Sequence, residues 1–230
     1  MTAALVAGCS LLGLVVGWLL DPVITRVPRK VPVLGPPAAD EPPPSPTRRV
    51  VVTVVCGALF GAMAARFDDS WALPAYLVLT AALVALSVID FEHYLLPNRI
   101  VFPLAGALLV LFALAALGDG DFDAYLRALA GAAVAFLLYF LLHLVSPRSM
   151  GFGDVKLSFS LGLALAWIGW GEEFLGVFLA FFYGAVIGIA LILTRARDRK
   201  QHVPFGPFMT AGALTAILVG DAVITWYRGG

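Results

Sequence analysis

The chain has 230 residues, of which 61% are hydrophobic and 13% are charged, and its mean hydropathy is +0.94. Soluble domains are about half apolar and a quarter charged, so this composition excludes an ordinary soluble globular fold. Fifteen basic and fifteen acidic residues give a formal net charge of zero. The overall charge therefore does not indicate binding to nucleic acid or attachment to a membrane surface.

The apolar residues occur in runs long enough to cross about 30 Å of hydrocarbon as helices. Helices are favoured because every backbone amide in lipid must find its partner within the protein. We therefore predict an all-α fold, a polytopic membrane bundle of about eight transmembrane helices that forms one domain over residues 1–230. The predicted spans are residues 3–20, 50–65, 72–89, 100–117, 125–145, 157–170 (the shortest), 174–194 and 207–225.

The first apolar run has no basic segment before it and no small-residue cleavage site after it, so we expect a retained helix rather than a signal peptide. Residues 21–49 follow and contain nine prolines. Proline at this density predicts an extended or disordered connection without a second domain. The two cysteines, Cys9 and Cys56, lie inside apolar runs without a ligand partner nearby, which indicates packing residues and no metal site.

The positions of the basic residues predict the orientation, because cytoplasmic loops collect Lys and Arg. One set of alternating connections holds twelve basic residues and the other set holds three. This asymmetry predicts that both chain ends face out and that the connections at 21–49, 90–99, 146–156 and 195–206 face the cytoplasm. The twelve are Arg26, Arg29, Lys30, Arg48, Arg49, Arg99, Arg148, Lys156, Arg195, Arg197, Arg199 and Lys200, and the three are Arg66, Arg127 and Arg228. The acidic residues predicted to face out are Asp68, Asp69, Asp119, Asp121, Asp123, Glu172 and Glu173.

Two acidic residues at the ends of apolar spans are the candidates for chemistry, since ionised carboxylates near lipid need a partner or water. Asp90 directly follows the third span, and Asp154 lies just ahead of the sixth. Both are predicted at the cytoplasmic side, at similar depth. Two neighbouring carboxylates share a proton, so that one accepts a proton from water while the other supports the carbonyl oxygen of a scissile peptide. An aspartyl protease of this kind needs no metal and no cofactor.

Three residues near Asp154 fit the same interpretation. Gly151 and Gly153 lack a Cβ, so they permit close approach of an extended substrate and unusual φ values. Lys156 would favour the ionised form of Asp154 if its side chain points back toward it. The alternative interpretation is structural, because a single Asp at a helix end is most often a cap and the sequence Gly-x-Gly-Asp is often only a turn. Glu92 and His93 are expected in the loop after Asp90, near the headgroups.

At these residues the chain resembles the type IV prepilin peptidases, a family of membrane aspartyl proteases with a Gly-x-Gly-Asp motif. Residues 89–98 (IDFEHYLLPN) resemble the segment around the family's first catalytic aspartate, and residues 151–157 (GFGDVKL) resemble the second. Residues 17–28 (GWLLDPVITRVP) and 203–208 (VPFGPF) are also similar to family segments. The resemblance implies that Asp90 and Asp154 are catalytic. It also implies cleavage of short basic leaders from type IV prepilin or pseudopilin precursors, at the cytoplasmic face of a bacterial inner membrane.

One departure concerns the first cytoplasmic loop. Many members of the family carry two Cys-x-x-Cys pairs there, which bind zinc, and also methylate the new amino terminus of the pilin. Residues 21–49 contain no cysteine. We therefore expect no zinc. The resemblance supports peptidase activity more strongly than N-methyltransferase activity.

A function from another class remains as an alternative. The same carboxylates would serve as relay groups in a small proton-coupled transporter or channel. Such proteins tend to carry internal repeats and acidic residues near the middle of the membrane, and the sequence has neither. A structural membrane subunit, in which both aspartates are loop residues, is the third possibility.

Overall fold

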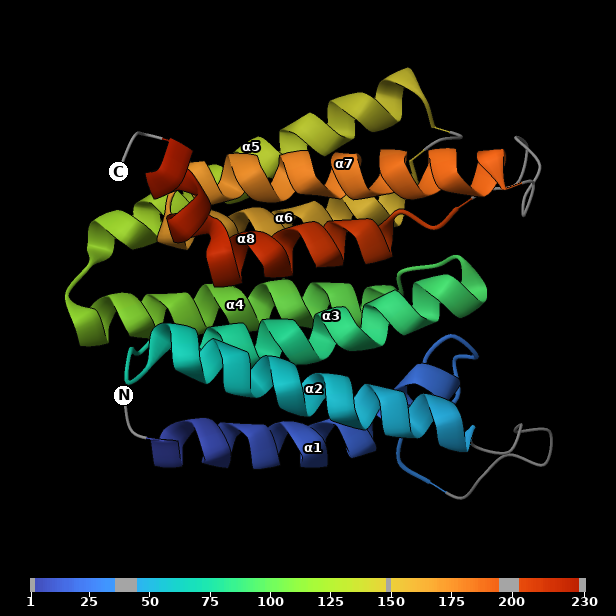
Figure 1. Cartoon of the computed structure of the whole chain (residues 1–230), viewed down its shortest axis with the longest axis horizontal. Coiled ribbons are helices and arrows are strands. Elements are labelled where there is room, and N and C mark those ends of the chain that lie inside the picture. Colours follow the sequence, from blue (N-terminus) through green and yellow to red (C-terminus); the bar gives the residue numbers. More distant parts are fainter. Residues whose placement is uncertain (1–2, 36–44, 148–149, 195–202, 228–230) are drawn as a thin grey trace.

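The computed structural model describes residues 3–35, 45–147, 150–194 and 203–227. Within these residues the chain forms eight α-helices and no strand (Figure 1). The all-α prediction is confirmed. The helices are α1 (Ala3–Arg26), α2 (Pro46–Phe67), α3 (Leu73–His93), α4 (Asn98–Asp119), α5 (Phe122–Val145), α6 (Phe152–Ile168), α7 (Trp170–Leu193) and α8 (Gly206–Tyr227).

The chain is a multi-pass membrane protein. Each predicted apolar run corresponds to one helix, and seven of the eight are long and apolar enough to cross a membrane. The exception is α6, which has 17 residues. Twelve of its residues are buried inside the protein, so this helix is covered by neighbouring helices rather than by lipid.

The helices lie side by side along the long axis of the bundle (Figure 1). The closest pairs are α1 with α2, α5 with α6, and α7 with α8. Two helices occupy central positions: α3 contacts α1, α2, α4 and α8, while α6 contacts α4, α5, α7 and α8. The hydroxyl of Tyr76 on α3 donates a 2.8 Å hydrogen bond to the carbonyl of Ala164 on α6. The two helices that carry the candidate aspartates are thus fixed within the core.

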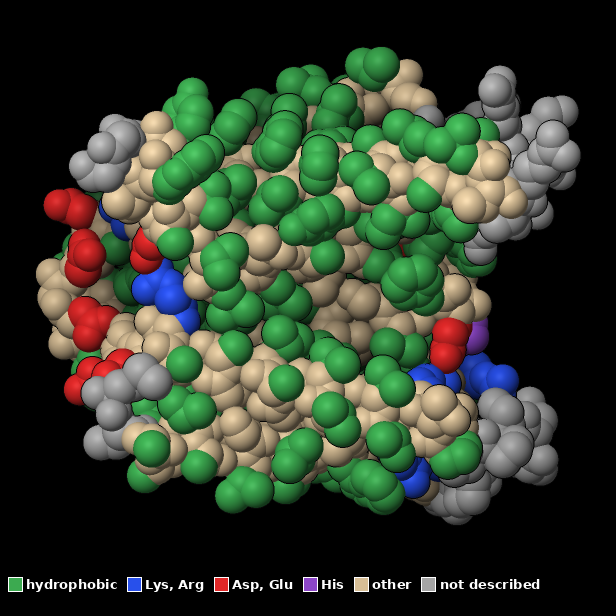
Figure 2. All heavy atoms as spheres, viewed as in Figure 1, with side chains coloured by type: hydrophobic (Ala, Val, Ile, Leu, Met, Phe, Trp, Pro, Cys, Tyr) green, Lys and Arg blue, Asp and Glu red, His purple; other side chains and the backbone are tan. Residues whose placement is uncertain are grey.

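Figure 1 places the last turns of α3, α5 and α7 and the first turns of α4, α6 and α8 at one end of the bundle, on the right, which we call the Asp90 end. The opposite end, on the left, is called the Glu172 end and carries both chain termini. In Figure 2, acidic side chains gather at the Glu172 end, and a hydrophobic band covers the face between the ends. Seven of the twelve basic residues predicted on one side belong to the described segments, whereas Arg148, Arg195, Arg197, Arg199 and Lys200 lie outside the described residues.

The predicted connection at 21–49 is shorter than expected, because helices extend into it from both sides. α1 continues through Pro22 to Arg26, and the hydroxyl of Thr25 bonds the carbonyl of Asp21 at 2.9 Å. α2 begins at Pro46, in the first turn, where proline is tolerated because its missing N–H would have no helical partner. The prediction of an extended or disordered connection was therefore wrong at both ends of residues 21–49, and residues 36–44 lie outside the described residues.

Two acidic residues at the Glu172 end were predicted in a connection between helices, and this part of the prediction was wrong. Glu172 and Glu173 belong to the first turn of α7, and both are buried. Arg66 on α2 forms an ion pair with Asp221 on α8. Arg127 on α5 donates to the carbonyls that end α6, at 2.7 Å to Ala166, 2.6 Å to Trp167 and 3.3 Å to Ile168.

Candidate active site

Asp90 lies in the last turn of α3 and is 5% exposed. Its Oδ2 accepts a 3.0 Å hydrogen bond from the backbone N–H of Gly206, the first residue of α8. A helix N-terminus presents N–H groups without intrahelical partners, and these groups stabilise a carboxylate. The start of α8 therefore orients the carboxyl group at the end of α3.

Asp154 lies in the first turn of α6 and is 7% exposed. The backbone N–H of Gly151, the N-cap residue, donates a 3.0 Å hydrogen bond to Oδ2 of Asp154, so the side chain of this third helical residue caps the helix by reaching back to its start. The sequence placed Asp154 just ahead of a span beginning at 157, whereas the helix already begins at Phe152. The cap expected from the structural interpretation is present, and it fixes one carboxylate oxygen.

The two carboxyl groups lie at the same end of the bundle and interact electrostatically. α3 ends at this end of the bundle, and α6 begins there (Figure 1). Both side chains are largely withdrawn from solvent, where two neighbouring carboxylates cannot both ionise cheaply. Asp90 and Asp154 are therefore two buried carboxyl groups at one end of the bundle, and the charge of each disfavours ionisation of the other.

Leu96, in the turn between α3 and α4, lies near a neighbour of each aspartate: Gly153, which precedes Asp154, and Gly206, which donates a hydrogen bond to Asp90. A Cβ added to Gly153 would lie 3.0 Å from Cβ of Leu96, and one added to Gly206 would lie 3.4 Å from its Cδ2. A Cβ on Gly206 would also lie 2.6 Å from Oδ2 of Asp90. A side chain at 206 would therefore force the carboxylate of Asp90 to shift, and one at 153 would press against Leu96.

The unusual backbone angles expected at the two glycines of the Gly-x-Gly-Asp motif are absent. Gly151 has extended angles of φ −69° and ψ 148°, and Gly153 lies within α6. Among the described residues, only Gly35 and Gly120 are glycines with positive φ. The expectation of special φ values was wrong. At Gly153 the lack of a Cβ instead makes room for Leu96.

The side chain of Lys156 lies against α4. Its Nζ donates a 3.0 Å hydrogen bond to Oδ1 of Asn98 and lies 4.8 Å and 5.4 Å from the ring centres of Phe152 and Phe102. The condition under which Lys156 would act on Asp154, a side chain pointing back to it, is thus not met. Lys156 joins the start of α6 to the start of α4.

No cluster of three or more His, Cys, Asp or Glu suited to a metal occurs among the described residues. Cys9 and Cys56 are free and buried. The packing role predicted for them is confirmed. The expectation that the protein needs no metal or cofactor stays a prediction.

Gly206 and Leu96 are the site residues that the sequence analysis did not assign. Both lay in stretches noted for their family resemblance, residues 203–208 and 89–98. A signal existed for Gly206, which begins the eighth helix and is followed by a proline. Gly206 and Asp90 are 116 positions apart in the chain, and a local sequence pattern does not reveal a contact at that separation.

The profile of the type IV leader peptidase family matches residues 77–193, which include both aspartates and just over half of the chain. The chain belongs to this family. Three similar relatives are each named prepilin leader peptidase/N-methyltransferase. The relative from Aeromonas hydrophila is 36% identical over 188 residues, that from Pseudomonas aeruginosa is 34% identical over 183, and that from Bacillus subtilis is 32% identical over 178.

These alignments cover 80%, 78% and 76% of this chain, respectively. They cover 62%, 61% and 67% of the three relatives, so the chain spans about three fifths of the length of the first two. No solved structure gives a significant match. Family membership therefore rests on the sequence comparisons. The arrangement of the polar residues around Asp90 and Asp154 comes from the structure of this chain.

Proposed function

We propose that this member of the type IV leader peptidase family is a membrane aspartic endopeptidase. Its substrates on this proposal are type IV prepilin or pseudopilin precursors, from which it removes the leader peptide. The observation that carries the proposal is the buried pair formed by Asp90 and Asp154. Two carboxyl groups from the end of one central helix and the start of another interact at one end of the bundle.

The chemistry of such a pair follows from the proton that the two groups share. The ionised carboxylate accepts a proton from the attacking water, while the protonated carboxyl donates a hydrogen bond to the carbonyl oxygen of the scissile peptide. The proton then passes to the leaving amine. Gly206 and Gly151 support this cycle because each donates a backbone hydrogen bond to one oxygen of one carboxyl group, which fixes the orientation of both groups.

The proposal places the pair at the cytoplasmic face of a bacterial inner membrane. The support is the distribution of basic residues, because Arg26, Arg48, Arg49, Arg99 and Lys156 all belong to the helix ends or connections of the Asp90 end. Cytoplasmic connections are enriched in Lys and Arg. Leaders with basic residues would approach from that side.

We limit the proposal to the peptidase activity. The relatives are named for a second activity, N-methyltransferase, but this chain has no cysteine between residues 21 and 49. The resemblance associates methyl transfer with a cysteine-containing zinc loop. Among the described residues, no group of three or more His, Cys, Asp or Glu is placed to hold a metal ion.

Co-expression with candidate pilin precursors tests the proposal. The amino terminus of the product is then examined by mass measurement, which reports the cleavage position and any added methyl group together. We expect a shortened precursor with an unmodified amino terminus. Full-length precursor in every pairing, with the peptidase present in the membrane, would contradict the proposed activity.

A further inference from the structure

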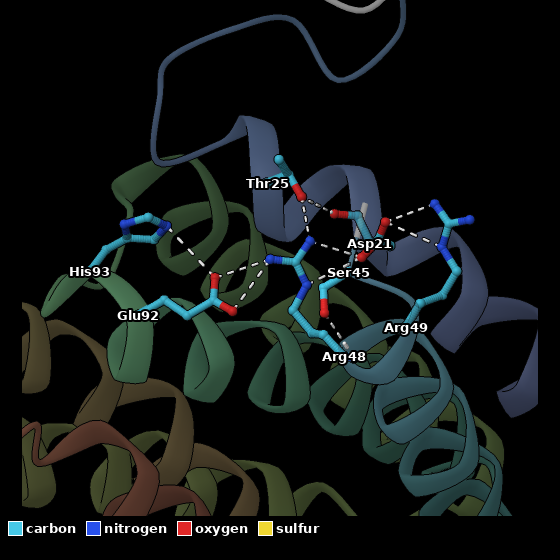
Figure 3. Close-up of polar contacts among 7 residues, drawn as sticks. All are labelled: Asp21, Thr25, Ser45, Arg48, Arg49, Glu92 and His93. Atoms are coloured by element: carbon cyan, nitrogen blue, oxygen red, sulfur yellow. Dashed lines mark hydrogen bonds and ion pairs between the residues drawn. The ribbon is translucent and has the colours of Figure 1, made fainter. Parts of the chain in front are cut away.

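Asp21, in α1, is a buried carboxylate held by two consecutive arginines of α2. It is 3% exposed, and Figure 3 shows the two guanidinium groups meeting it from opposite sides. Arg48 donates to Oδ1 at 2.9 Å, and Arg49 donates to Oδ2 at 2.8 Å. Charge-assisted bonds of this kind are stronger than bonds between neutral groups. They join α1 to α2 at the Asp90 end.

The two arginines differ in what else they contact. Arg49 lies over the ring of Trp18, 4.6 Å from its centre, and so binds α1 a second time. Arg48 donates to the hydroxyl of Thr25 at 2.6 Å, and its Nη1 donates to both carboxylate oxygens of Glu92 on α3, at 3.1 and 3.3 Å (Figure 3). Arg48 therefore connects three helices.

Glu92 shares the last turn of α3 with Asp90. Helix ends unwind more readily than helix centres, because their last carbonyls lack intrahelical partners. This end stops at Tyr94, which has φ 54° and whose N–H bonds the carbonyl of Asp90 at 2.9 Å. A residue other than glycine adopts positive φ only when its surroundings hold it there. The position of Asp90 thus depends on groups that keep this turn wound.

We propose that Arg48 is a positioning residue for Asp90, acting through Glu92. The inference rests on the proposed function and deepens it. Arg48 holds the last turn of α3 against the α1–α2 pair, and that pair lies outside the segment matched by the family profile. The α1–α2 pair is accordingly part of the apparatus that sets the geometry of the aspartates.

The experiment compares Arg48→Gln with Arg49→Gln in the full-length, purified chain. Both variants lose one charged partner of Asp21, but only Arg48→Gln loses the bond to α3. With a precursor that co-expression has identified as cleaved, we expect kcat to fall about five- to tenfold for Arg48→Gln and for Glu92→Gln, with KM within about twofold of the parent. The double variant should be no worse than either single variant. Arg49→Gln should retain kcat within about twofold.

Hydrogen–deuterium exchange supplies a second readout that does not depend on cleavage. Amides of residues 90–94 should exchange faster in Arg48→Gln and Glu92→Gln than in the parent and in Arg49→Gln. If Arg48→Gln does not insert, Glu92→Gln carries both measurements, because Glu92 is exposed and its loss leaves Asp21 paired. Unchanged exchange and kcat in Glu92→Gln, additive losses in the double variant, or equal losses in Arg49→Gln would overturn the inference. A parent that cleaves nothing overturns the proposed function instead, while the exchange measurement still decides the role of Arg48.

Discussion

The backbone N–H of Gly206 donates a 3.0 Å hydrogen bond to Oδ2 of Asp90, although 116 positions separate the two residues. This bond joins the start of α8 to the end of α3 and fixes one carboxylate oxygen. It also leaves no room for a side chain, because a Cβ on Gly206 would lie 2.6 Å from the same oxygen. The orientation of Asp90 is therefore set by a residue far from it in the sequence.

Gly206→Ala should lose most cleavage activity. The added methyl group would displace the carboxylate of Asp90, and a displacement of about 1 Å can lower a rate by roughly a hundredfold. Initial rates of precursor cleavage, at matched amounts of purified protein, provide the measurement. Gly106→Ala is the control, since a Cβ there meets nothing within 4 Å. Equal rates for the two variants would mean that the Gly206 contact does not matter for activity.

Gly153→Ala and Gly131→Ala should fail in different ways. The methyl group on Gly153 would meet Leu96, so we expect an inserted protein with a rate about tenfold lower. Gly131, in the middle of α5, lies at a tight helix contact, because a Cβ there would collide with Ala166 and lie 2.7 Å from Oε2 of Glu173. Gly131→Ala should therefore lower the yield of folded protein. Size-exclusion profiles and cleavage rates per folded molecule separate the two effects, and near-normal cleavage by Gly153→Ala would remove Gly153 from the site.

Arg127→Gln should destabilise the protein without directly altering the aspartates. Arg127 supplies donors to the carbonyls that end α6, and hydrogen bonds from charged groups contribute roughly 1.5–3 kcal/mol. We expect a loss of roughly 2–3 kcal/mol in the free energy of unfolding, seen as a lower Tm in detergent. Arg99→Gln, at an exposed position of α4, serves as the control. A Tm equal to that of the control would indicate that water replaces the Arg127 bonds.

Cysteine labelling tests which end of the bundle faces the cytoplasm. Leu95→Cys places a thiol at the Asp90 end, and Asp123→Cys places one at the Glu172 end, both at exposed positions. The native cysteines are buried, which keeps the background low. An impermeant thiol reagent added to intact cells should label Asp123→Cys and spare Leu95→Cys. The reverse pattern would invert the orientation.

The sequence predicted the eight helices because apolar runs of this length have few other solutions in lipid. It misplaced particular ends. The first span was expected to end near residue 20, but α1 continues through Pro22 to Arg26, and α6 begins at Phe152 rather than near 157 because Asp154 caps it. Helix ends depend on capping bonds and on neighbouring helices, which hydropathy does not register.

The two aspartates were identified from their positions and from the family resemblance, but their surroundings were not. The roles of Gly206, Leu96 and Glu92 depend on contacts between helices that are distant in the chain. Lys156 illustrates the same limit, since proximity in sequence suggested Asp154 and the fold turns the side chain to Asn98. Side-chain direction around a helix, not distance along the chain, decides such pairings.

Cleavage by the Asp90→Asn and Asp154→Asn variants tests the central claim most directly. Asparagine keeps the shape of the side chain but cannot exchange the proton that the pair is proposed to share. Each purified, inserted variant should show no measurable cleavage of a precursor that the parent cuts, and the double variant should be no different, because the two groups act as one unit. Substantial cleavage by either single variant, at equal amounts of folded protein, would contradict the proposal that Asp90 and Asp154 form the catalytic pair.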